Sequence, residues 1–237
     1  MSTTTTTTKQ RLVTQIFSAL AKGKQPAHEP RPVLEQFIYA VCREATTRDL
    51  ADKAYRNLQE RFFDWNEIRV SSARELAEAL TGLPHPEARA QRIIDFLQEV
   101  FETTFSFDLE ALEKKGVKLA AKQLGRYQAA NDYAVSQVVQ NSLGGHAIPL
   151  DEPSMRALRR LGLLDGDAGD MEAVRAGIEH QVPKARAPLF IDLLSILADD
   201  YCHEDEPRCN ACPLGKECPT GQDLRAAATS HGSRKPR

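Results

Sequence analysis

The sequence predicts an all-α protein. Apolar residues recur at helical spacing in one segment after another, which is the pattern of helices that each bury one face. We find no stretch with the apolar–polar alternation of a half-buried strand, and no Asn-Gly turn signal joining two such stretches. Both observations favour a core built from helices alone.

The first helix is expected to follow a polar tail. Residues 1–8 (MSTTTTTT) have no means of burying apolar surface, so we expect them to be disordered. Apolar side chains then recur on one helical face from Lys9 to Lys24. Prolines mark residues 25–32 as a linker, and Pro32 suits the first turn of the next helix.

The helix that begins at Pro32 carries Cys42 on its apolar stripe, where a thiol is expected to behave as a small buried hydrophobe. Another helix is predicted from Thr47. Its inward positions are expected to be Leu50, Ala54, Tyr55 and Leu58.

Two short helices follow, and we expect Asp64 and Ser72 to cap their N-termini. Residues 87–101 are strongly amphipathic and predict a longer helix. One further helix is predicted from about Leu109 to Gly125.

The stretch after Gly125 combines turn and helix signals. A short turn at 129–132 leads into a helix that Gly144 and Gly145 are expected to end. An extended segment, 146–150, then delivers Asp151 to the start of another helix. The free N–H groups there suit an ionised carboxylate, so Asp151 is either a helix cap alone or a functional acid.

Composition sets broad limits. The 237 residues are 41% hydrophobic and 27% charged, as in ordinary soluble globular proteins. No apolar run approaches the roughly 18 residues of a membrane span, so no membrane association is expected. The formal net charge of −2 is unfavourable for nucleic acid binding, which would have to rely on local basic patches.

Four of the five cysteines fall within 17 residues near the end of the chain, with the spacing C-x6-C-x2-C-x5-C. So short a loop cannot bury a core of its own, and four thiolates brought together require a cation. The loop is therefore expected to fold around a metal or a cluster. The cysteines are Cys202, Cys209, Cys212 and Cys218.

Three interpretations compete for these cysteines. Two disulfides would fit a secreted protein, but nothing here looks like a signal peptide, and reduced thiols point to a cytoplasmic setting. A structural zinc usually takes two C-x2-4-C pairs, whereas only Cys209 and Cys212 form one. A 4Fe-4S cluster tolerates uneven spacings and is the interpretation we favour.

The spacing of the four cysteines closely resembles the cluster loop that ends the endonuclease III family of DNA glycosylases. The resemblance spans roughly residues 9–220. It is strongest in the cysteine loop and moderate around Asp151, whose following helix resembles the family's basic helix. It implies a two-lobed helix–hairpin–helix fold with a C-terminal 4Fe-4S cluster loop.

The resemblance also implies site residues. The family places a catalytic Lys 18 residues before its Asp, which matches Tyr133 and Asp151 here. Arg156 and Arg159 match the basic helix and are expected to contact DNA. Tyr133 resembles the residue of a thymine-mismatch subgroup that removes a base and stops, and a phenol cannot form the imine needed for strand cleavage.

The hairpin departs from the family pattern. Ala129 and Asn131 stand where the family has glycines whose N–H groups approach a DNA phosphate. Asn tolerates positive φ, whereas the Cβ of Ala129 could crowd the phosphate. Glu44 stands in place of a Gln that fills the gap beside a flipped base, and a carboxylate near the DNA backbone is repelled.

The resemblance implies four parts: a tail at 1–8, a cluster domain from 9–26 plus 146–220, a helical bundle with a degenerate helix–hairpin–helix at 27–145, and a flexible basic tail at 221–237. Double-stranded DNA is the expected partner of a monomer, lying across the cleft between the lobes with a base flipped toward Tyr133 and Asp151.

The predicted activity is that of a monofunctional DNA N-glycosylase of base excision repair, without β-lyase chemistry. The alternative is a catalytically silent DNA-binding iron–sulfur protein of the same fold. A third hypothesis, a cluster protein with no nucleic-acid role, rests on the mildly acidic net charge.

Overall fold

The computed structural model describes residues 6–21, 30–164 and 171–232. Every regular element in these ranges is a helix, and no strand occurs among them, so the predicted all-α class is confirmed. The helices belong to two compact units. One unit is Ala27–Asp151, and the other combines Met1–Pro26 with Glu152–Arg237.

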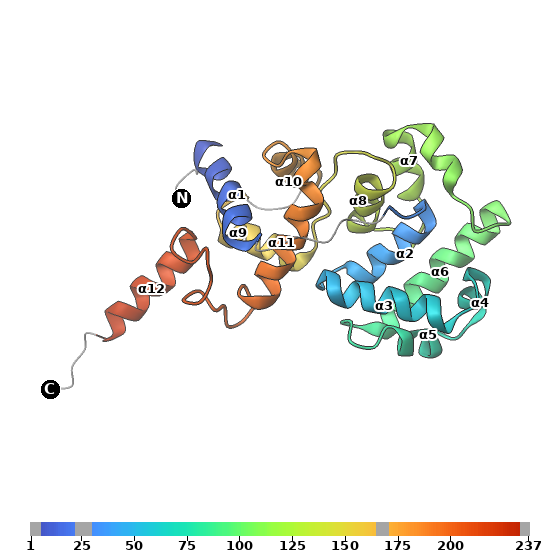
Figure 1. Ribbon diagram of the computed structural model, residues 1–237, viewed down its shortest axis with the longest axis horizontal. Coiled ribbons are helices and arrows are strands. Elements are labelled where there is room, and N and C mark those ends of the chain that lie inside the picture. Colours follow the sequence, from blue (N-terminus) through green and yellow to red (C-terminus); the bar gives the residue numbers. More distant parts are fainter. Residues whose placement is uncertain (1–5, 22–29, 165–170, 233–237) are drawn as a thin grey trace. The chain divides into compact units, whose positions relative to one another are not determined.

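The unit Ala27–Asp151 is a helical bundle (Figure 1). Within it α2 packs against α3 and α8, while α6 packs against α4 and α5. The rings of Phe37 and Phe96 stack at its centre with their centroids 3.7 Å apart. Its helices are α2 (Val33–Arg43), α3 (Arg48–Arg61), α4 (Trp65–Val70), α5 (Ala73–Ala79), α6 (Pro86–Thr104), η1 (Glu110–Lys115), α7 (Val117–Leu124) and α8 (Asp132–Asn141).

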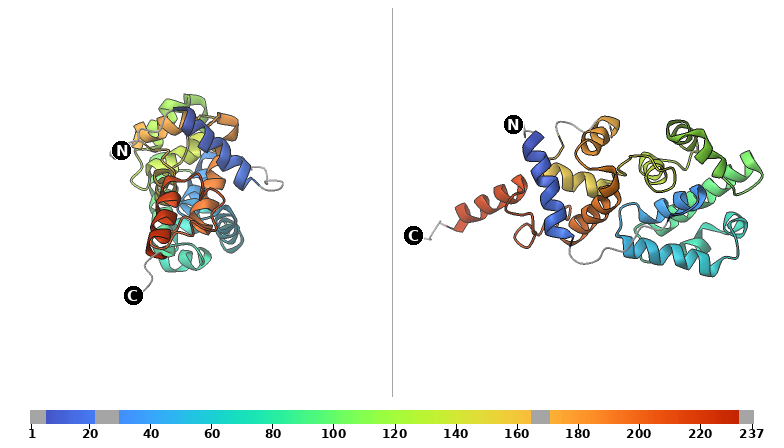
Figure 2. Two further views of the ribbon diagram at one scale, coloured as in Figure 1. Left: turned by 90° about the vertical axis from the view of Figure 1, so that its left-hand side faces the viewer. Right: turned by 45° about the horizontal axis from the view of Figure 1, so that its top comes forward.

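The second unit is formed by the two ends of the chain. Helix α11 lies at its centre and packs against both α1 and α9 (Figure 2). Phe17 of α1 meets Phe190 of α11 with ring centroids 5.9 Å apart. The helices of this unit are α1 (Thr6–Leu20), α9 (Glu152–Arg160), α10 (Met171–Glu179), η2 (Lys184–Arg186), α11 (Ala187–Asp200) and α12 (Pro219–Gly232).

Most of the predicted caps and inward positions are observed. The side chain of Asp64 accepts a hydrogen bond from the N–H of Glu67, and Ser72 accepts one from the N–H of Glu75. The thiol of Cys42 is fully buried. The spacing predicts an inward Leu50, but it is 41% exposed, because the buried face of α3 runs along Ala51, Ala54, Tyr55 and Leu58 and Leu50 lies to one side of it.

Other expectations need correction. Pro32 is the N-cap of α2 and not a first-turn residue. The single helix expected from 109 to 125 is two helices, because Gly116 adopts a φ of 77° that L side chains rarely take. The tails also differ: residues 6–8 are helical, and the expected basic tail 221–237 continues α12 as far as Gly232. Residues 25–29 of the expected linker, residues 22–24 at the end of the expected first helix, and residues 1–5 of the expected disordered tail lie outside the described residues.

The segment that leads to Asp151 is held close to the bundle. Asn131 caps α8, with its side-chain oxygen accepting from the N–H of Ala134 at 2.9 Å. After α8 the N–H of Gly145 returns to the carbonyl of Val139. A Cβ at Gly145 would lie 2.4 Å from a Val139 methyl, so only glycine permits this approach.

Candidate functional site

The site is built around the turn that ends α2. Glu44 is the C-cap of that helix, and Ala45 follows with a φ of 52°. This left-handed conformation costs an L residue about 1–2 kcal/mol. Strain of this kind persists where surrounding contacts hold it in place, and it is common at functional sites. Here it turns the N–H of Ala45 out of the helix and toward Asp151.

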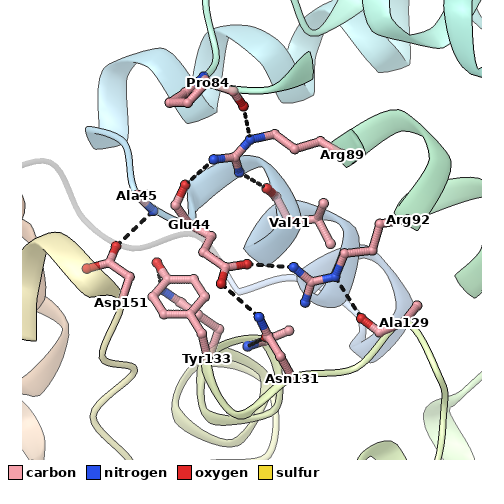
Figure 3. A network of polar contacts seen from close by, with 12 residues as sticks. Val41, Glu44, Ala45, Pro84, Arg89, Arg92, Ala129, Asn131, Tyr133 and Asp151 are labelled. Atoms are coloured by element: carbon pink, nitrogen blue, oxygen red, sulfur yellow. Dashed lines mark hydrogen bonds and ion pairs between the residues drawn. The ribbon is translucent and has the colours of Figure 1, made fainter. Parts of the chain in front are cut away.

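Asp151 is the acid of the site. Its side chain is buried, with 8% of the residue exposed. The Oδ2 atom accepts a hydrogen bond from the N–H of Ala45 at 2.9 Å (Figure 3). A backbone N–H that donates to a carboxylate oxygen fixes the orientation of that carboxylate. The two residues are 106 positions apart in sequence, so the fold alone brings them together.

Tyr133 lies near this carboxylate and is 3% exposed. Burial raises the pKa of its phenol well above the usual value, and the charge of Asp151 acts in the same direction, while Arg43 opposes both. Gln137 donates its amide N–H to the phenol oxygen at 3.0 Å. Tyr133 is therefore a neutral group at physiological pH, and its oxygen already accepts one hydrogen bond.

Glu44 is held in an ion-pair network. Its carboxylate accepts from Arg92 at 2.6 Å and from the side-chain amide of Asn131 at 2.7 Å. Arg92 also donates its Nε–H to the carbonyl of Ala129 at 2.7 Å. The carboxylate that was expected to repel DNA is thus neutralised within the protein (Figure 3).

A second guanidinium fixes the backbone of the same turn. Arg89 donates to the carbonyls of Pro84, Val41 and Glu44, so it ties α6 to the end of α2. Burial lowers the pKa of Arg89. The turn at 44–45 is therefore held through its side chain by Arg92 and through its main chain by Arg89.

The hairpin predicted to touch DNA already has partners in the protein. The carbonyl of Ala129 accepts from Arg92, and the amide of Asn131 donates to Glu44. The N–H of Gln128 donates to the carboxylate of Glu99 at 2.8 Å. An open groove runs between α6 and this hairpin, lined by Ala88, Gln91, Arg92, Asp95, Gln98, Glu99, Glu102 and residues 128–131.

The two arginines predicted to bind DNA lie on α9, in the other unit. Arg156 donates its Nε–H to the carbonyl of Cys202 at 3.0 Å. Arg159 pairs with Glu152 at 3.2 Å, and both side chains are well exposed. Arg156 therefore braces the cysteine loop, residues 202–218, while Arg159 stays at the surface.

The four predicted cysteines line a single cavity. Apolar groups of α9 and α11, among them Ala157, Leu161 and Leu197, form its other walls. Burial raises the pKa of the Cys212 and Cys218 thiols. Thiolates in such surroundings need a cation nearby. Among the described residues, no three His, Cys, Asp or Glu side chains converge closely enough to hold a single metal ion.

Arginines and a glycine shape the cysteine loop. Arg160 donates to the carbonyls of His203 and Glu204, and Arg225 of α12 donates to the carbonyl of Cys209 at 3.0 Å. A Cβ at Gly215 would lie 2.1 Å from that same Cys209 carbonyl, so the chain can turn there only without a side chain.

Sequence reasoning missed Arg89, Arg92 and Gln137. Their positions carry no motif, since each lies on a helix where a polar residue is typical of a solvated face. Spacing along the helix therefore offers no signal that would have found them.

No helix among the described residues is long and apolar enough to cross a membrane.

The chain is similar in sequence to a plant DNA glycosylase. No family model matches the chain. The DNA glycosylase/AP lyase ROS1 of Arabidopsis thaliana is 24% identical over 213 residues, which is 83% of this chain but only 15% of that protein. The chain therefore spans a small part of the length of this relative.

Two groups of solved structures share the fold. A non-covalent endonuclease III–DNA complex superposes with a TM-score of 0.68 at 18% identity, covering 92% of this chain and 98% of the other. A thermostable thymine-DNA glycosylase superposes with a TM-score of 0.63 at 15% identity, with the same coverage of both chains. The fold is that of endonuclease III and related helix–hairpin–helix DNA glycosylases.

Proposed function

We propose that this protein is a DNA N-glycosylase of base excision repair that releases a base by hydrolysis and lacks β-lyase activity. The observation that carries the proposal is the buried carboxylate of Asp151, oriented by the N–H of Ala45 next to the neutral phenol of Tyr133. These residues lie in a fold shared with DNA glycosylases.

The residues suit a hydrolytic reaction. As the N-glycosidic bond breaks, its electron pair leaves with the base and the sugar carbon becomes cationic. The charge of Asp151 would stabilise that cation and orient a water molecule toward it. Water then bonds to the sugar carbon and gives up a proton, for which the Asp151 carboxylate is the nearby base, while the departing base also takes up a proton from solvent.

Among the described residues of the unit Ala27–Asp151, no lysine is buried beside Tyr133. The unit Ala27–Asp151 contains five lysines, Lys53, Lys114, Lys115, Lys118 and Lys122, and all of them are exposed. Tyr133 supplies a phenol, which its burial keeps protonated. Strand cleavage through a Schiff base needs an unprotonated amine next to the sugar carbon. This supports a reaction that ends with base release.

Double-stranded DNA is the proposed partner. The endonuclease III of the matching structure is in complex with DNA, and this chain covers nearly all of that fold. The hairpin at 127–131 and the turn at 44–45 are the proposed contact segments in the unit Ala27–Asp151. Because hairpin groups are engaged by Glu99 and Arg92, we expect binding to be weak and strongly dependent on salt.

The cysteine loop is proposed to hold a 4Fe-4S cluster through its four thiolates. The cysteines line one cavity with apolar walls, yet among the described residues no three of them converge on a point as ligands of one zinc ion would. A cluster has four separate iron atoms, so it suits ligands that surround a space instead of a point. Its proposed role here is to hold the loop in its fold.

The decisive experiment is a base-release assay on a panel of duplexes that carry single lesions or mismatches. Asp151→Asn should lower the single-turnover rate about 100- to 10,000-fold, since it removes the charge opposite the developing cation. Glu152→Gln is the matched control, because it removes a neighbouring exposed carboxylate. Equal rates for wild type and Asp151→Asn would overturn the assignment of Asp151.

Borohydride trapping on an abasic duplex separates the two classes of glycosylase. Wild-type protein should give no covalent adduct, and Tyr133→Lys tests whether an amine at this position restores trapping. A wild-type adduct that disappears in Lys122→Ala would contradict the proposal. DNA binding without release of any base in the panel would instead favour the catalytically silent alternative.

A further inference from the structure

We infer that Glu44 is a positioning residue that couples the hairpin at 127–131 to the carboxylate of Asp151. This inference rests on the proposed function, in which Asp151 is the catalytic carboxylate of base release. Its physical basis is one connected set of contacts inside the unit Ala27–Asp151, drawn in Figure 3.

The first half of the connection joins Glu44 to the hairpin. Asn131 donates its side-chain amide to Oε1 of Glu44 at 2.7 Å, and Arg92 donates to Oε2 at 2.6 Å. Arg92 also holds the hairpin itself through the carbonyl of Ala129. One carboxylate oxygen of Glu44 thus contacts the hairpin directly, through Asn131. The other contacts it indirectly, through the guanidinium of Arg92.

The second half joins the same residue to the acid. Ala45 follows Glu44 by one peptide bond, and its N–H is the donor to Asp151. Ala45 stays in the left-handed region at a φ of 52°, which is unfavourable for a residue with a Cβ. The side-chain contacts of Glu44 hold the turn together with the main-chain contacts of Arg89, so the direction of the Ala45 N–H depends in part on Glu44.

The chemistry of the network explains why a carboxylate is required at position 44. Both partners of its side chain, Arg92 and Asn131, are donors, so two acceptor oxygens are needed at once. A glutamine offers one acceptor oxygen and would direct an N–H at one of the two donors. The side chains of Glu44 and Arg92 are only 24% and 22% exposed, so water compensates poorly for a lost contact.

Movement of the hairpin would therefore change the orientation of the Asp151 carboxylate. If a DNA backbone displaces the hairpin, the Glu44 carboxylate moves with Asn131 and Arg92, and the adjoining Ala45 N–H turns relative to Asp151. In this arrangement the Asp151 carboxylate is correctly oriented only when the hairpin is correctly placed.

The test is residue-resolved hydrogen exchange of the Ala45 amide in the free protein, measured by NMR. Glu44→Gln should speed exchange at Ala45 about tenfold, the effect of losing one charge-assisted hydrogen bond that holds the turn. Glu78→Gln is the matched control, because Glu78 forms a similarly short ion pair with Arg61 at 2.9 Å in the same unit. It should change exchange at Ala45 by less than about twofold.

Amides in the middle of α3 and α6 report unfolding of the whole unit, so they distinguish a local effect from a general loss of stability. If Glu44→Gln does not fold, Asn131→Ser replaces it, since serine still caps α8 but cannot reach Glu44. Exchange at Ala45 that changes no more than at α3 and α6 would overturn the coupling.

A second arm uses base release from the duplex most active with wild type. Glu44→Gln should slow release about tenfold in the wild-type background and less than about twofold in the Asp151→Asn background, because it acts through that carboxylate. Equal losses in both backgrounds would overturn the inference. If wild type releases no base, the proposed function fails, and the exchange experiment alone still decides the coupling.

Discussion

The two candidate sites of this molecule are assembled in opposite ways. The cysteine loop gathers its four thiols from 17 consecutive residues, and its cavity is completed by helices of the same unit. The carboxylate site is formed by Glu44, Ala45, Tyr133 and Asp151, and its hydrogen bond from Ala45 to Asp151 joins residues 106 positions apart. The first is a property of a short stretch of sequence, whereas the second exists only once a whole bundle has folded.

This difference determines what holds each site in place. In the cysteine loop the main contacts are donations from arginines to backbone carbonyls, which depend little on the identity of the residues that supply those carbonyls. In the carboxylate site the contacts are between particular side chains, and Glu44 alone accepts from two of them. A substitution should therefore act through retention of the proposed cluster in one site and through side-chain geometry in the other.

The largest effect is expected from Cys212→Ser. Loss of one thiolate should release the cluster, which would hold about four irons, and should unfold the unit that contains the loop, because ligand binding and folding are linked. Iron content and the absorbance of the air-free protein measure this. Cys42→Ala is the control, since Cys42 is a buried thiol of the other unit. Full solubility of a colourless Cys212→Ser protein would contradict a fold-forming cluster.

A large effect is also expected at alkaline pH in the unit that holds the carboxylate site. Burial raises the pKa of Tyr39, Tyr55 and Tyr133, with Asp52 and Glu35 adding to the effect at the first two. Above about pH 10 the unfolded chain loses phenolic protons that the folded unit retains. The free energy of unfolding should then fall by about 1.4 kcal/mol per pH unit for each tyrosine, or about 4 kcal/mol for three.

Below pH 10 this contribution to stability is fully present, so the loss is confined to the alkaline side. Tyr55→Phe should reduce the slope of stability against pH by about 1.4 kcal/mol per pH unit, because one of the buried phenols no longer titrates. Circular dichroism during denaturant titrations at several alkaline pH values measures the slope. An unchanged slope in Tyr55→Phe would show that this phenol ionises equally in both states.

A smaller effect should separate the two arginines of α9. Arg156→Gln removes a charged donor from the carbonyl of Cys202 and should lower the free energy of unfolding of its unit by about 1–2 kcal/mol. Arg159→Gln breaks only an exposed ion pair and should cost less than about 0.5 kcal/mol. DNA affinity measured at two salt concentrations tests the phosphate role predicted for both. Weaker DNA binding with unchanged stability in Arg156→Gln would support a phosphate contact for Arg156 and contradict its bracing of the cysteine loop.

The smallest effect is expected from Asn131→Ser. Serine retains the cap of α8 and loses only the contact with Glu44, which lies at an exposed edge, so the free energy of unfolding should fall by less than about 1 kcal/mol. Asn131→Ala also removes the cap and should cost about 1 kcal/mol more. Thermal unfolding of the two variants measures the difference. Equal midpoints would mean that the cap contributes nothing.

The features that could be predicted from the sequence are those that depend on a few neighbouring residues. The helical class follows from apolar spacing, and the caps at Asp64 and Ser72 follow from residue type and position, because each depends on three or four neighbouring residues. The cysteine loop could be identified for the same reason. Leu50 is the exception, because apolar spacing locates a helix face only approximately and the small Ala51, not Leu50, lies on the buried face of α3.

The contacts of the carboxylate site could not be predicted in this way. Nothing near Glu44 in the sequence indicates that Arg92 of α6 would neutralise it, or that Ala45 would take a left-handed conformation. Alanine carries no signal for positive φ, since tertiary contacts impose that conformation against its own preference. The contact of Arg156 with the Cys202 carbonyl could not be predicted either, because a positive charge on a helix has the same sequence pattern whether it meets a phosphate or a backbone carbonyl, and its contact with DNA stays a prediction.

The pairing of the first helix with the last third of the chain has a consequence for biosynthesis. Helix α1 packs against α11, and Gln10 donates to the carbonyl of Gln181, 171 residues later. At a synthesis rate of about 5–20 residues per second, α1 leaves the ribosome roughly 10–35 s before its partner. During that interval the apolar face of α1 has no native surface to cover it. The unit Ala27–Asp151 is complete earlier and can fold on the nascent chain, whereas α1 lacks its packing partner until α11 has been synthesised.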